Sequence, residues 1–296
     1  MGRGYHERGF APRPQPVPAA LPPLLSFAAG FIDSFTVLAL FGMFVAQVTG
    51  SFVLAAAAFV TKEQGAVTKV LAIPVFLLAA VVTTSLAVMV ERRGRAAIAW
   101  ALGLECVVLT GFLVVVFVRA PLADPNAVAV VVASLLGLFA MGMQSATVRL
   151  LMKNVASTNV MTTNTTQIAI DATELAFAWH THRRVPADVA AAAAYHAARM
   201  RVAGLFPIML GFLLGTAAGT IAYVTIGPWG LLLPVAIMYG VFGWASGWRD
   251  ARARCPDPSS DHCAAPSFAN LGIEGHWHFG LAARMMRTSE PPHSGR

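Results

Sequence analysis

The sequence predicts an all-α fold: a polytopic transmembrane helical bundle with two internal repeats and six to eight membrane segments. Hydrophobic residues make up 57% of the chain and charged residues 12%, about half the charge of a soluble domain. The mean hydropathy is +0.66. The apolar residues form long runs, and residues 70–90, 107–118, 127–148 and 202–248 contain no charge. A soluble protein with several buried helices is disfavoured because such runs rarely fit a soluble core.

Eight apolar segments are predicted, each close to the roughly 20 residues that cross a bilayer as a helix. They cover about 22–42, 44–60, 70–90, 96–118, 127–147, 157–178, 202–226 and 229–247. Residues 1–20 are rich in Pro, Gly and Arg and are predicted to be a disordered lead. Residues 21–120 form the first membrane repeat and 121–248 the second. Residues 249–296 are predicted to be a mostly disordered cytoplasmic tail, in which residues 277–285 have the spacing of a short interfacial helix.

The repeat prediction depends on two similar polar stretches, residues 44–51 (FVAQVTGS) and 158–165 (TNVMTTNT). Each follows an apolar segment that contains a glycine and a polar residue. The third and seventh segments also correspond, because Thr83 and Thr216 lie at the same distance after Pro74 and Pro207. A duplicated polar motif in an apolar chain is typical of a membrane protein with a functional cleft between two repeats.

Two topologies remain open. If all eight segments span, the repeats are parallel, and the Arg92–Arg95 turn lies outside, against the positive-inside rule. If segments two and six are re-entrant, six helices span, the repeats are inverted, and the arginine-rich turns lie inside. Charge favours six spans and segment length favours eight; both place the two termini in the cytoplasm. The net charge of +7 is interpreted as an orientation signal and not as a nucleic-acid interface.

Asp33 is the most informative single residue because it lies inside the first apolar segment. A carboxylate at the bilayer centre costs about 2.5–3.5 kcal/mol on insertion scales, so it usually faces a polar cavity or a partner. Asp33 is therefore either a proton, cation or substrate site or a buried hydrogen-bonding group. Glu105 poses the same question, with the structural interpretation favoured.

The sixth segment carries a polar stripe. Asn164, Gln167, Asp171 and Glu174 are spaced three, four and three residues apart, which places them on one helix face. Such a stripe is expected beside water or a substrate path. The alternative is that the end of this helix has left the membrane, which applies most strongly to Glu174.

The two motifs suit broken or tightly packed helices, because hydroxyl and amide groups replace backbone hydrogen bonds lost at a break. Paired breaks commonly line a midplane site; the alternative is that these residues only hold crossing helices together. The predicted substrate-binding residues are Asp33, Gln47, Thr49, Gly50, Ser51, Gln144, Thr162, Asn164 and Gln167. Asp33 and Asp171 are the candidates for proton coupling.

Other patterns predict no chemistry. Gly211, Gly215 and Gly219 form two overlapping GxxxG patterns, which indicate a helix-packing face. The pairs His180/His182 and His276/His278 lack further ligands at a persuasive spacing, so no metal is predicted. No catalytic arrangement and no cofactor motif is visible, and the chain is predicted not to be an enzyme.

The motifs quoted above, together with residues 30–33 (GFID), resemble the YoaK family of bacterial membrane proteins, also labelled DUF1275. The resemblance covers roughly residues 22–247. The family pattern after the first helix is Thr-Gly-Asn; here Ser51 stands at the Asn position, and Thr163 stands at the Gly position of the second copy. The resemblance implies a multi-pass protein of the bacterial inner membrane and implies no substrate.

The leading functional hypothesis is a secondary transporter or permease of a small polar molecule, with its site between the repeats. A gradient or a partner ATPase would supply the energy, since no ATP-binding motif is visible. The alternative is a non-transporting membrane scaffold or sensor; a lipid-modifying enzyme is a third, weaker idea. The expected partners are the lipid bilayer and an unknown small-molecule substrate, with no nucleic acid, and a homo-oligomer is compatible with the sequence.

Overall fold

The computed structural model describes residues 15, 17–61, 65–120, 122–152, 155–158, 160–185 and 188–254. The chain divides into two units, residues 1–249 and 250–296. The first unit contains nearly all of the described residues. The described part of the second unit is the last turn of a helix. The proposed interfacial helix at 277–285 and the pair His276/His278 lie outside the described residues.

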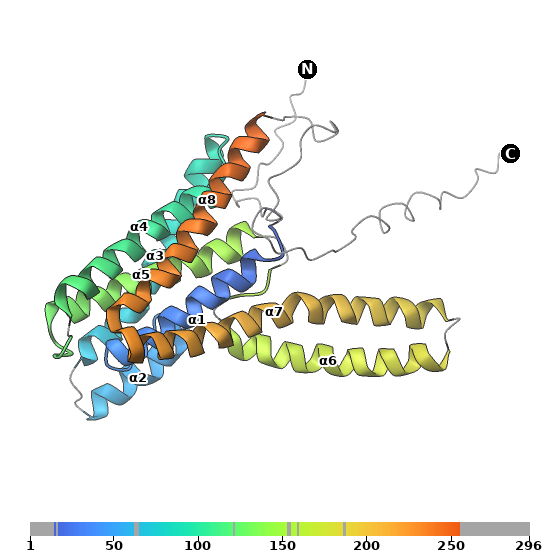
Figure 1. Ribbon diagram of the computed structural model, residues 1–296, viewed down its shortest axis with the longest axis horizontal. Helices are drawn as coiled ribbons and strands as arrows, with labels where there is room; N and C mark the ends of the chain where they lie inside the picture. Colours follow the sequence, from blue (N-terminus) through green and yellow to red (C-terminus); the bar gives the residue numbers. More distant parts are fainter. Residues whose placement is uncertain are drawn as a thin grey trace, which may run out of the picture. The chain divides into compact units, whose positions relative to one another are not determined.

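The described part of the chain is all-α, as predicted. Its helices are α1 (Leu21–Ala39), α2 (Val48–Thr61), α3 (Ala66–Arg92), α4 (Ala97–Arg119), α5 (Val128–Leu151), α6 (Met161–Arg184), α7 (Val189–Ile226), the 3-10 helix η1 (Gly227–Leu231) and α8 (Leu232–Arg254). Each predicted apolar segment corresponds to one α-helix. The helices follow the chain in the order shown in Figure 1.

One predicted boundary is wrong by 13 residues. The sequence predicts the seventh segment at about 202–226, whereas α7 begins at Val189. Hydropathy identified only the apolar part of this helix. Residues 190–194 are all Ala, the best helix former, and they extend the helix through a stretch that also carries His and Arg. Asp188 caps the new start, its side chain accepting a 2.8 Å hydrogen bond from the Ala190 N–H.

The α1–α7 interface confirms the predicted glycine packing face. A Cβ atom placed on Gly211, Gly215 or Gly219 would overlap the carbonyl oxygens of Pro23, Phe27 and Phe31 respectively. The absence of side chains at these glycines lets the two backbones approach closely. Because both residue numbers rise together, α1 and α7 run parallel. Gly30 completes the interface from the α1 side, where a Cβ would overlap the Phe212 carbonyl.

Helices α4 and α5 form an antiparallel pair. Val118 and Ala129 line one hollow near the turn that joins them, and further along the pair the Phe112 ring lies beside Gly137. The residue number therefore falls along α4 as it rises along α5, and the numbers of two facing residues add up to about 247–249. On its other side α5 meets α3, where a Cβ on Gly142 would lie 2.8 Å from the Ala79 Cβ.

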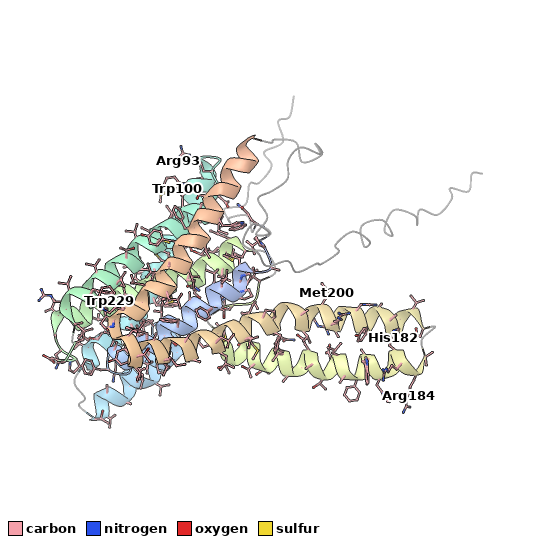
Figure 2. All side chains as sticks on the ribbon, viewed as in Figure 1. Arg93, Trp100, His182, Arg184, Met200 and Trp229 are labelled. Atoms are coloured by element: carbon pink, nitrogen blue, oxygen red, sulfur yellow. The ribbon has the colours of Figure 1, made fainter. Side chains whose placement is uncertain are left out.

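A long helical hairpin distinguishes the second half of the chain. Helix α6 packs against the first part of α7, and the two lie side by side in Figure 1. Figure 2 shows His182, Arg184 and Met200 on this hairpin. The pair formed by α2 and α3 is shorter, since α2 has 14 residues and α6 has 24. The last five residues of α6, from His180 to Arg184, are all polar or charged.

Helix length and composition identify a membrane protein. Among the described residues, five helical stretches are long and apolar enough to cross a membrane: α1, α3, α4, α5 and the 59-residue stretch Val189–Gly247, which contains α7, η1 and most of α8. This last stretch is long enough for two crossings at about 20 residues each. Helix α2, with 14 residues, is too short, and α6 is too polar to belong to this set.

Candidate functional site

Asp33 organises the turn between α1 and α2. After α1 the chain reverses through Phe41 and Gly42, which have φ values of 55° and 80°. This reversal brings the N–H groups of Val45 and Ala46 to the Asp33 side chain, where both donate 2.8 Å hydrogen bonds to Oδ1. Asp33 is only 3% exposed. Its carboxylate therefore holds the first polar motif against its own helix.

Gln47 belongs to the same cluster. Its backbone N–H and its side chain both face the Asp33 carboxylate. Its carbonyl accepts a 2.9 Å hydrogen bond from the Gly50 N–H at the start of α2. A Cβ on Gly50 would lie 3.3 Å from the Phe44 ring, which is tighter than ordinary van der Waals contact. Three predicted site residues are thus gathered around one turn.

Ser51 and Asn164, which hold matching positions in the two motifs, make similar hydrogen bonds. Ser51 Oγ donates a 2.9 Å hydrogen bond to the Phe44 carbonyl, seven residues earlier. Asn164 Nδ2 donates a 2.7 Å hydrogen bond to the Ser157 carbonyl, also seven residues earlier. Both residues are buried. Ser51 therefore makes a hydrogen bond that matches the one made by Asn164 in the second polar stretch.

Each polar loop also packs on the first helix of the opposite half. The loop before α2 meets α5, because Val45 lies beside Gly137, where a Cβ would be 3.2 Å from Val45 Cγ1. The loop before α6 meets α1, where Ser26 Oγ donates a 3.3 Å hydrogen bond to the Thr158 carbonyl. The loops thus make reciprocal contacts between the halves, and these contacts surround the buried ends of both motifs.

Gln144 links the two halves directly. It lies on α5 and is fully buried. Its Nε2 donates a 2.8 Å hydrogen bond to the Leu25 carbonyl of α1. Its Oε1 has no hydrogen-bond partner among the described residues. Since Leu25 precedes Asp33 on α1 while Gln144 follows Gly137 on α5, the two first helices run antiparallel.

Glu105 was not among the predicted site residues. It lies on α4, is 0% exposed, and neither carboxyl oxygen has a hydrogen-bond partner in the described part of the chain. The available signal was an acidic residue within an otherwise uncharged apolar segment. Because α4 packs against α5, we group Glu105 with the buried polar residues of α5, such as Gln144.

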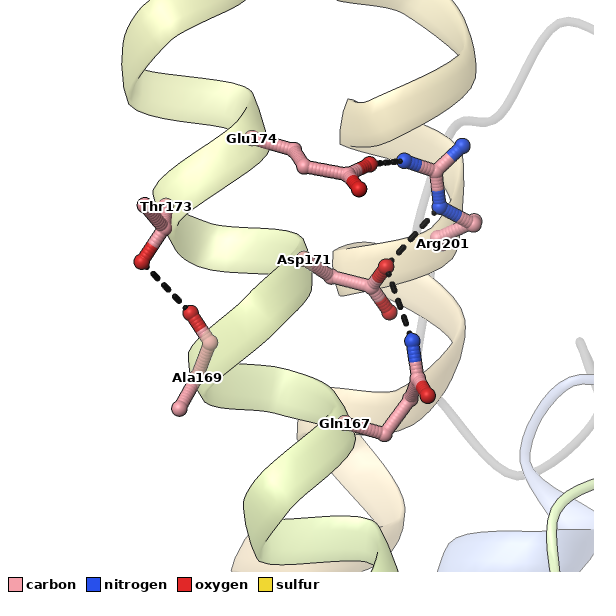
Figure 3. A network of polar contacts seen from close by, with 6 residues as sticks. All are labelled: Gln167, Ala169, Asp171, Thr173, Glu174 and Arg201. Atoms are coloured by element: carbon pink, nitrogen blue, oxygen red, sulfur yellow. Dashed lines mark hydrogen bonds and ion pairs between the residues drawn. The ribbon is translucent and has the colours of Figure 1, made fainter.

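Asp171 lies in a separate network on the hairpin (Figure 3). Arg201 of α7 donates from Nε to Asp171 Oδ1 at 2.9 Å and also pairs with Glu174 through Nη2. Gln167 Nε2 donates to the same Asp171 oxygen at 3.2 Å. Asp171 has a side chain 5% exposed, whereas that of Glu174 is 57% exposed. The network joins α6 to α7.

The predicted site residues therefore fall into several groups. Asp33, Gln47, Gly50 and Ser51 surround the first loop, Asn164 holds the second, Gln144 bridges α5 and α1, and Gln167 and Asp171 belong to the hairpin. Thr49 and Thr162 are exposed at the starts of α2 and α6.

A hollow of ≈ 420 Å³ lies apart from these groups, at the turn between α4 and α5. It is lined mainly by valines of the two helices together with Arg119, and none of the predicted site residues lines it.

Two side chains near the end of α6, His182 and Arg183, contact aromatic rings. The His182 ring stacks on Tyr195, with ring centroids 5.6 Å apart and an interplanar angle of 12°. Arg183 lies over the Trp179 ring at 4.4 Å from its centroid. Among the described residues no group of three His, Cys, Asp or Glu side chains could hold a metal ion. These contacts stabilise the end of the hairpin.

A family model described as "Protein of unknown function (DUF1275)" matches residues 21–244, which is more than half of the chain. The matched range begins with α1 and ends within α8, so it includes both polar loops and the hairpin. No curated protein and no solved structure matches the chain.

Proposed function

Since the chain belongs to the DUF1275 family, whose description assigns no function, we propose from its geometry that it is a secondary transporter of a small polar molecule. The observation that carries the proposal is the reciprocal contact of the two polar loops. The loop before α2 lies on α5, and the loop before α6 lies on α1, the first helix of the other half in each case. Interrupted helices at matching positions are how many transporters build a site near the bilayer midplane.

The directions of the helices support six spans with inverted halves. Helices α1 and α7 run parallel, α4 and α5 run antiparallel, and α1 runs against α5. With α1 crossing from the cytoplasm outward, the spans are α1, α3, α4, α5, α7 and α8. The turn after α3, the hairpin and the end of α8 then lie in the cytoplasm with their arginines, as the positive-inside rule requires. By the family resemblance the membrane is the bacterial inner membrane.

In this arrangement the substrate contacts the two loops and the buried groups between them. Asp33, Gln47, Gly50, Ser51, Asn164 and Gln144 supply the hydrogen-bonding groups nearest the contact of the halves. Thr49, Thr162 and Gln167 flank this region on α2 and α6. A polar solute would compete for the hydrogen bonds that Ser51 and Asn164 donate to loop carbonyls and that Asp33 accepts from loop N–H groups. Binding and loop movement are therefore linked. Transport would draw on a gradient.

A scaffold function is the second candidate, and a specific observation favours it. Ser51 and Asn164 both bond to backbone carbonyls of their own loops. Asp33 likewise accepts from two backbone N–H groups. In a scaffold these bonds are permanent, and the motifs only lock crossing helices together.

Thiol accessibility separates the two functions. The native cysteines are replaced, single cysteines are placed at positions 51 and 164, and a membrane-impermeant maleimide is added from each side in turn. A transporter exposes these buried positions as it opens, so both thiols react at measurable rates. If both stay unreactive from either side in folded protein, the scaffold function replaces transport.

Two exposed positions serve as sidedness controls. Arg93→Cys lies in the turn after α3 and is expected to react only from the cytoplasmic side. Asp124→Cys lies in the turn between α4 and α5 and is expected to react only from the opposite side. Reaction of both controls from the same side would contradict the six-span arrangement.

A further inference from the structure

Glu105 presents an unresolved electrostatic problem inside the bundle. Its side chain is 0% exposed, and both carboxyl oxygens lack a hydrogen-bond partner among the described residues. A bare carboxylate in such surroundings is strongly disfavoured, since neither water nor a donor compensates its charge. By contrast, Asp33 is nearly as buried but accepts two backbone hydrogen bonds. Burial without donors therefore favours the neutral, protonated form of Glu105.

The packing of α4 on α5 determines what Glu105 faces. Phe112 of α4 lies beside Gly137 of α5. Seven residues are two helical turns, about 10.5 Å along the axis, and return to nearly the same face. In an antiparallel pair, the residue seven positions before Phe112 on α4 therefore lies opposite the residue seven positions after Gly137 on α5. These positions are Glu105 and Gln144.

Gln144 supplies what a protonated Glu105 requires. Its amide nitrogen is already used at the Leu25 carbonyl, at 2.8 Å, which leaves Oε1 as a buried acceptor without a partner. A carboxylic acid carries one O–H donor, and a carboxylate carries none. An unpaired acid and an unpaired amide oxygen on the same level of two packed helices complement each other.

We infer that Glu105 and Gln144 form a proton-binding site between α4 and α5, in which the Glu105 carboxylic acid donates its O–H to Gln144 Oε1. Binding adds one proton to the Glu105 carboxylate, and release returns that proton to water. A metal ion fits less well, because among the described residues no three His, Cys, Asp or Glu side chains converge. A proton needs no space of its own between fully buried groups.

Proton release at this site would act on the contact between the two halves. An ionised Glu105 requires a donor, and the amide opposite it is a donor already in use at Leu25. Turning the amide toward the carboxylate withdraws it from α1. The inference thus rests on the proposed transport function and deepens it, because protonation of Glu105 on α4 would favour the contact of α5 with α1.

Few other charged or titratable groups lie near this site in the described part of the chain. Cys106 is adjacent on α4 and buried. Tyr239 of α8 is bonded to Thr110 at 2.9 Å. Asp33 of α1 lies near the level of Gly137, about two turns away. On α3 the charged residues are Lys69, Glu91 and Arg92, near the ends of the helix. None of these places a positive charge opposite Glu105.

Infrared spectroscopy of the purified protein in lipid nanodiscs tests the site directly. At pH 7 the wild-type protein is expected to show the carbonyl-stretch band of a buried protonated carboxylic acid. Glu105→Gln should remove that band, whereas the control Glu174→Gln, at an exposed carboxylate, should leave it. Gln144→Met keeps Glu105 but removes its acceptor, so the band should remain and move to higher frequency. This second variant protects the test if Glu105→Gln fails to fold.

Three results would overturn the inference. One is a folded wild-type protein without the band at pH 7, and another is a band that survives Glu105→Gln. The third is a band that appears only when sodium is withdrawn, because the site would then hold a metal ion. The proposed function is tested separately by the thiol labelling at positions 51 and 164. An infrared band without thiol labelling would retain the proton site and reject transport. Thiol labelling without the band would retain transport and reject the proton site.

One further measurement tests whether protonation of Glu105 is coupled to the exposure of positions 51 and 164. In a transporter, the labelling rates at positions 51 and 164 should change with pH in the wild-type background and become independent of pH in the Glu105→Gln background. Labelling that varies with pH equally in both backgrounds would show that Glu105 is not the coupling group.

Discussion

A single carboxylate decides the conformation of the first polar loop. Asp33 Oδ1 accepts two backbone hydrogen bonds at 2.8 Å, and the residue is only 3% exposed, so these bonds are buried. Each buried N–H left without an acceptor costs about 1–3 kcal/mol. The loop that contacts α5 therefore depends on this side chain for its shape.

Replacement of Asp33 should lower the stability of the folded protein. Asp33→Ala removes the acceptor of both N–H groups, and we expect a loss of about 3 kcal/mol. Asp33→Asn keeps one oxygen but loses the charge, and we expect a loss of about 1 kcal/mol. Thermal unfolding in detergent measures both. Asp124→Ala is the control, because it removes an acceptor from an exposed turn and should change stability by less than about 0.5 kcal/mol. Equal melting temperatures for Asp33→Ala and Asp124→Ala would contradict the role assigned to Asp33.

At the scale of the elements, the close approach of α1 and α7 depends on three glycines. The backbone of α1 occupies the space that side chains at Gly211, Gly215 and Gly219 would fill. The neighbouring hydroxyl of Thr216 bonds within its own helix, to the Phe212 carbonyl at 2.9 Å. At these three glycines the interface is therefore made by backbone contact, and beyond them the rings of Phe35 on α1 and Tyr223 on α7 meet edge to face with centroids 5.3 Å apart.

Addition of one methyl group at this interface should be costly. In Gly215→Ala the new Cβ would overlap the Phe27 carbonyl, so the helices must separate, and we expect a loss of about 3 kcal/mol. Gly243→Ala on α8 provides a matched control, since nothing lies within 4 Å of its Cβ. Alanine is a better helix former by about 1 kcal/mol, so this control should be neutral or slightly stabilising. If Gly215→Ala and the control Gly243→Ala unfold at the same temperature, close packing at Gly215 is excluded.

For the molecule as a whole, the decisive contact is the one between the first loop and the second half. Val45 and Gly137 are 92 positions apart in the sequence, yet a Cβ on Gly137 would lie 3.7 Å from the Val45 Cβ. Disulfide bonds have Cβ–Cβ distances of about 3.5–4.5 Å. The contact can therefore be tested covalently.

In a background without native cysteines, the pair Val45→Cys and Gly137→Cys should form a disulfide on mild oxidation. The pair Val45→Cys and Gly111→Cys is the control, because a Cβ on Gly111 meets Leu136 of α5 and not the loop. Mass spectrometry of the free thiols measures the yield. A yield no higher than that of the control would show that the loop does not reach α5.

The helices could be predicted from the sequence, but their partners could not. Hydropathy predicts each α-helix of the described residues, and the spacing of Gly211, Gly215 and Gly219 indicates a packing face. Where hydropathy and helix propensity differ, as at residues 189–201, hydropathy alone predicts a helix start that is too late. The two-repeat organisation and the substrate-binding role of the polar motifs remain predictions.

The sequence by itself determined that this is an all-α membrane protein of the DUF1275 family, because membrane insertion depends on the local composition of each segment. Only the tertiary structure decided that the loop of each half packs on the first helix of the other, and that the Glu105 carboxyl is buried without a hydrogen-bond partner among the described residues. Such contacts join residues far apart in the chain, and the apolar residues between them would fit many other helix pairings equally well. Local patterns therefore specify the helices, whereas close packing at particular glycines and buried polar groups selects which helices meet.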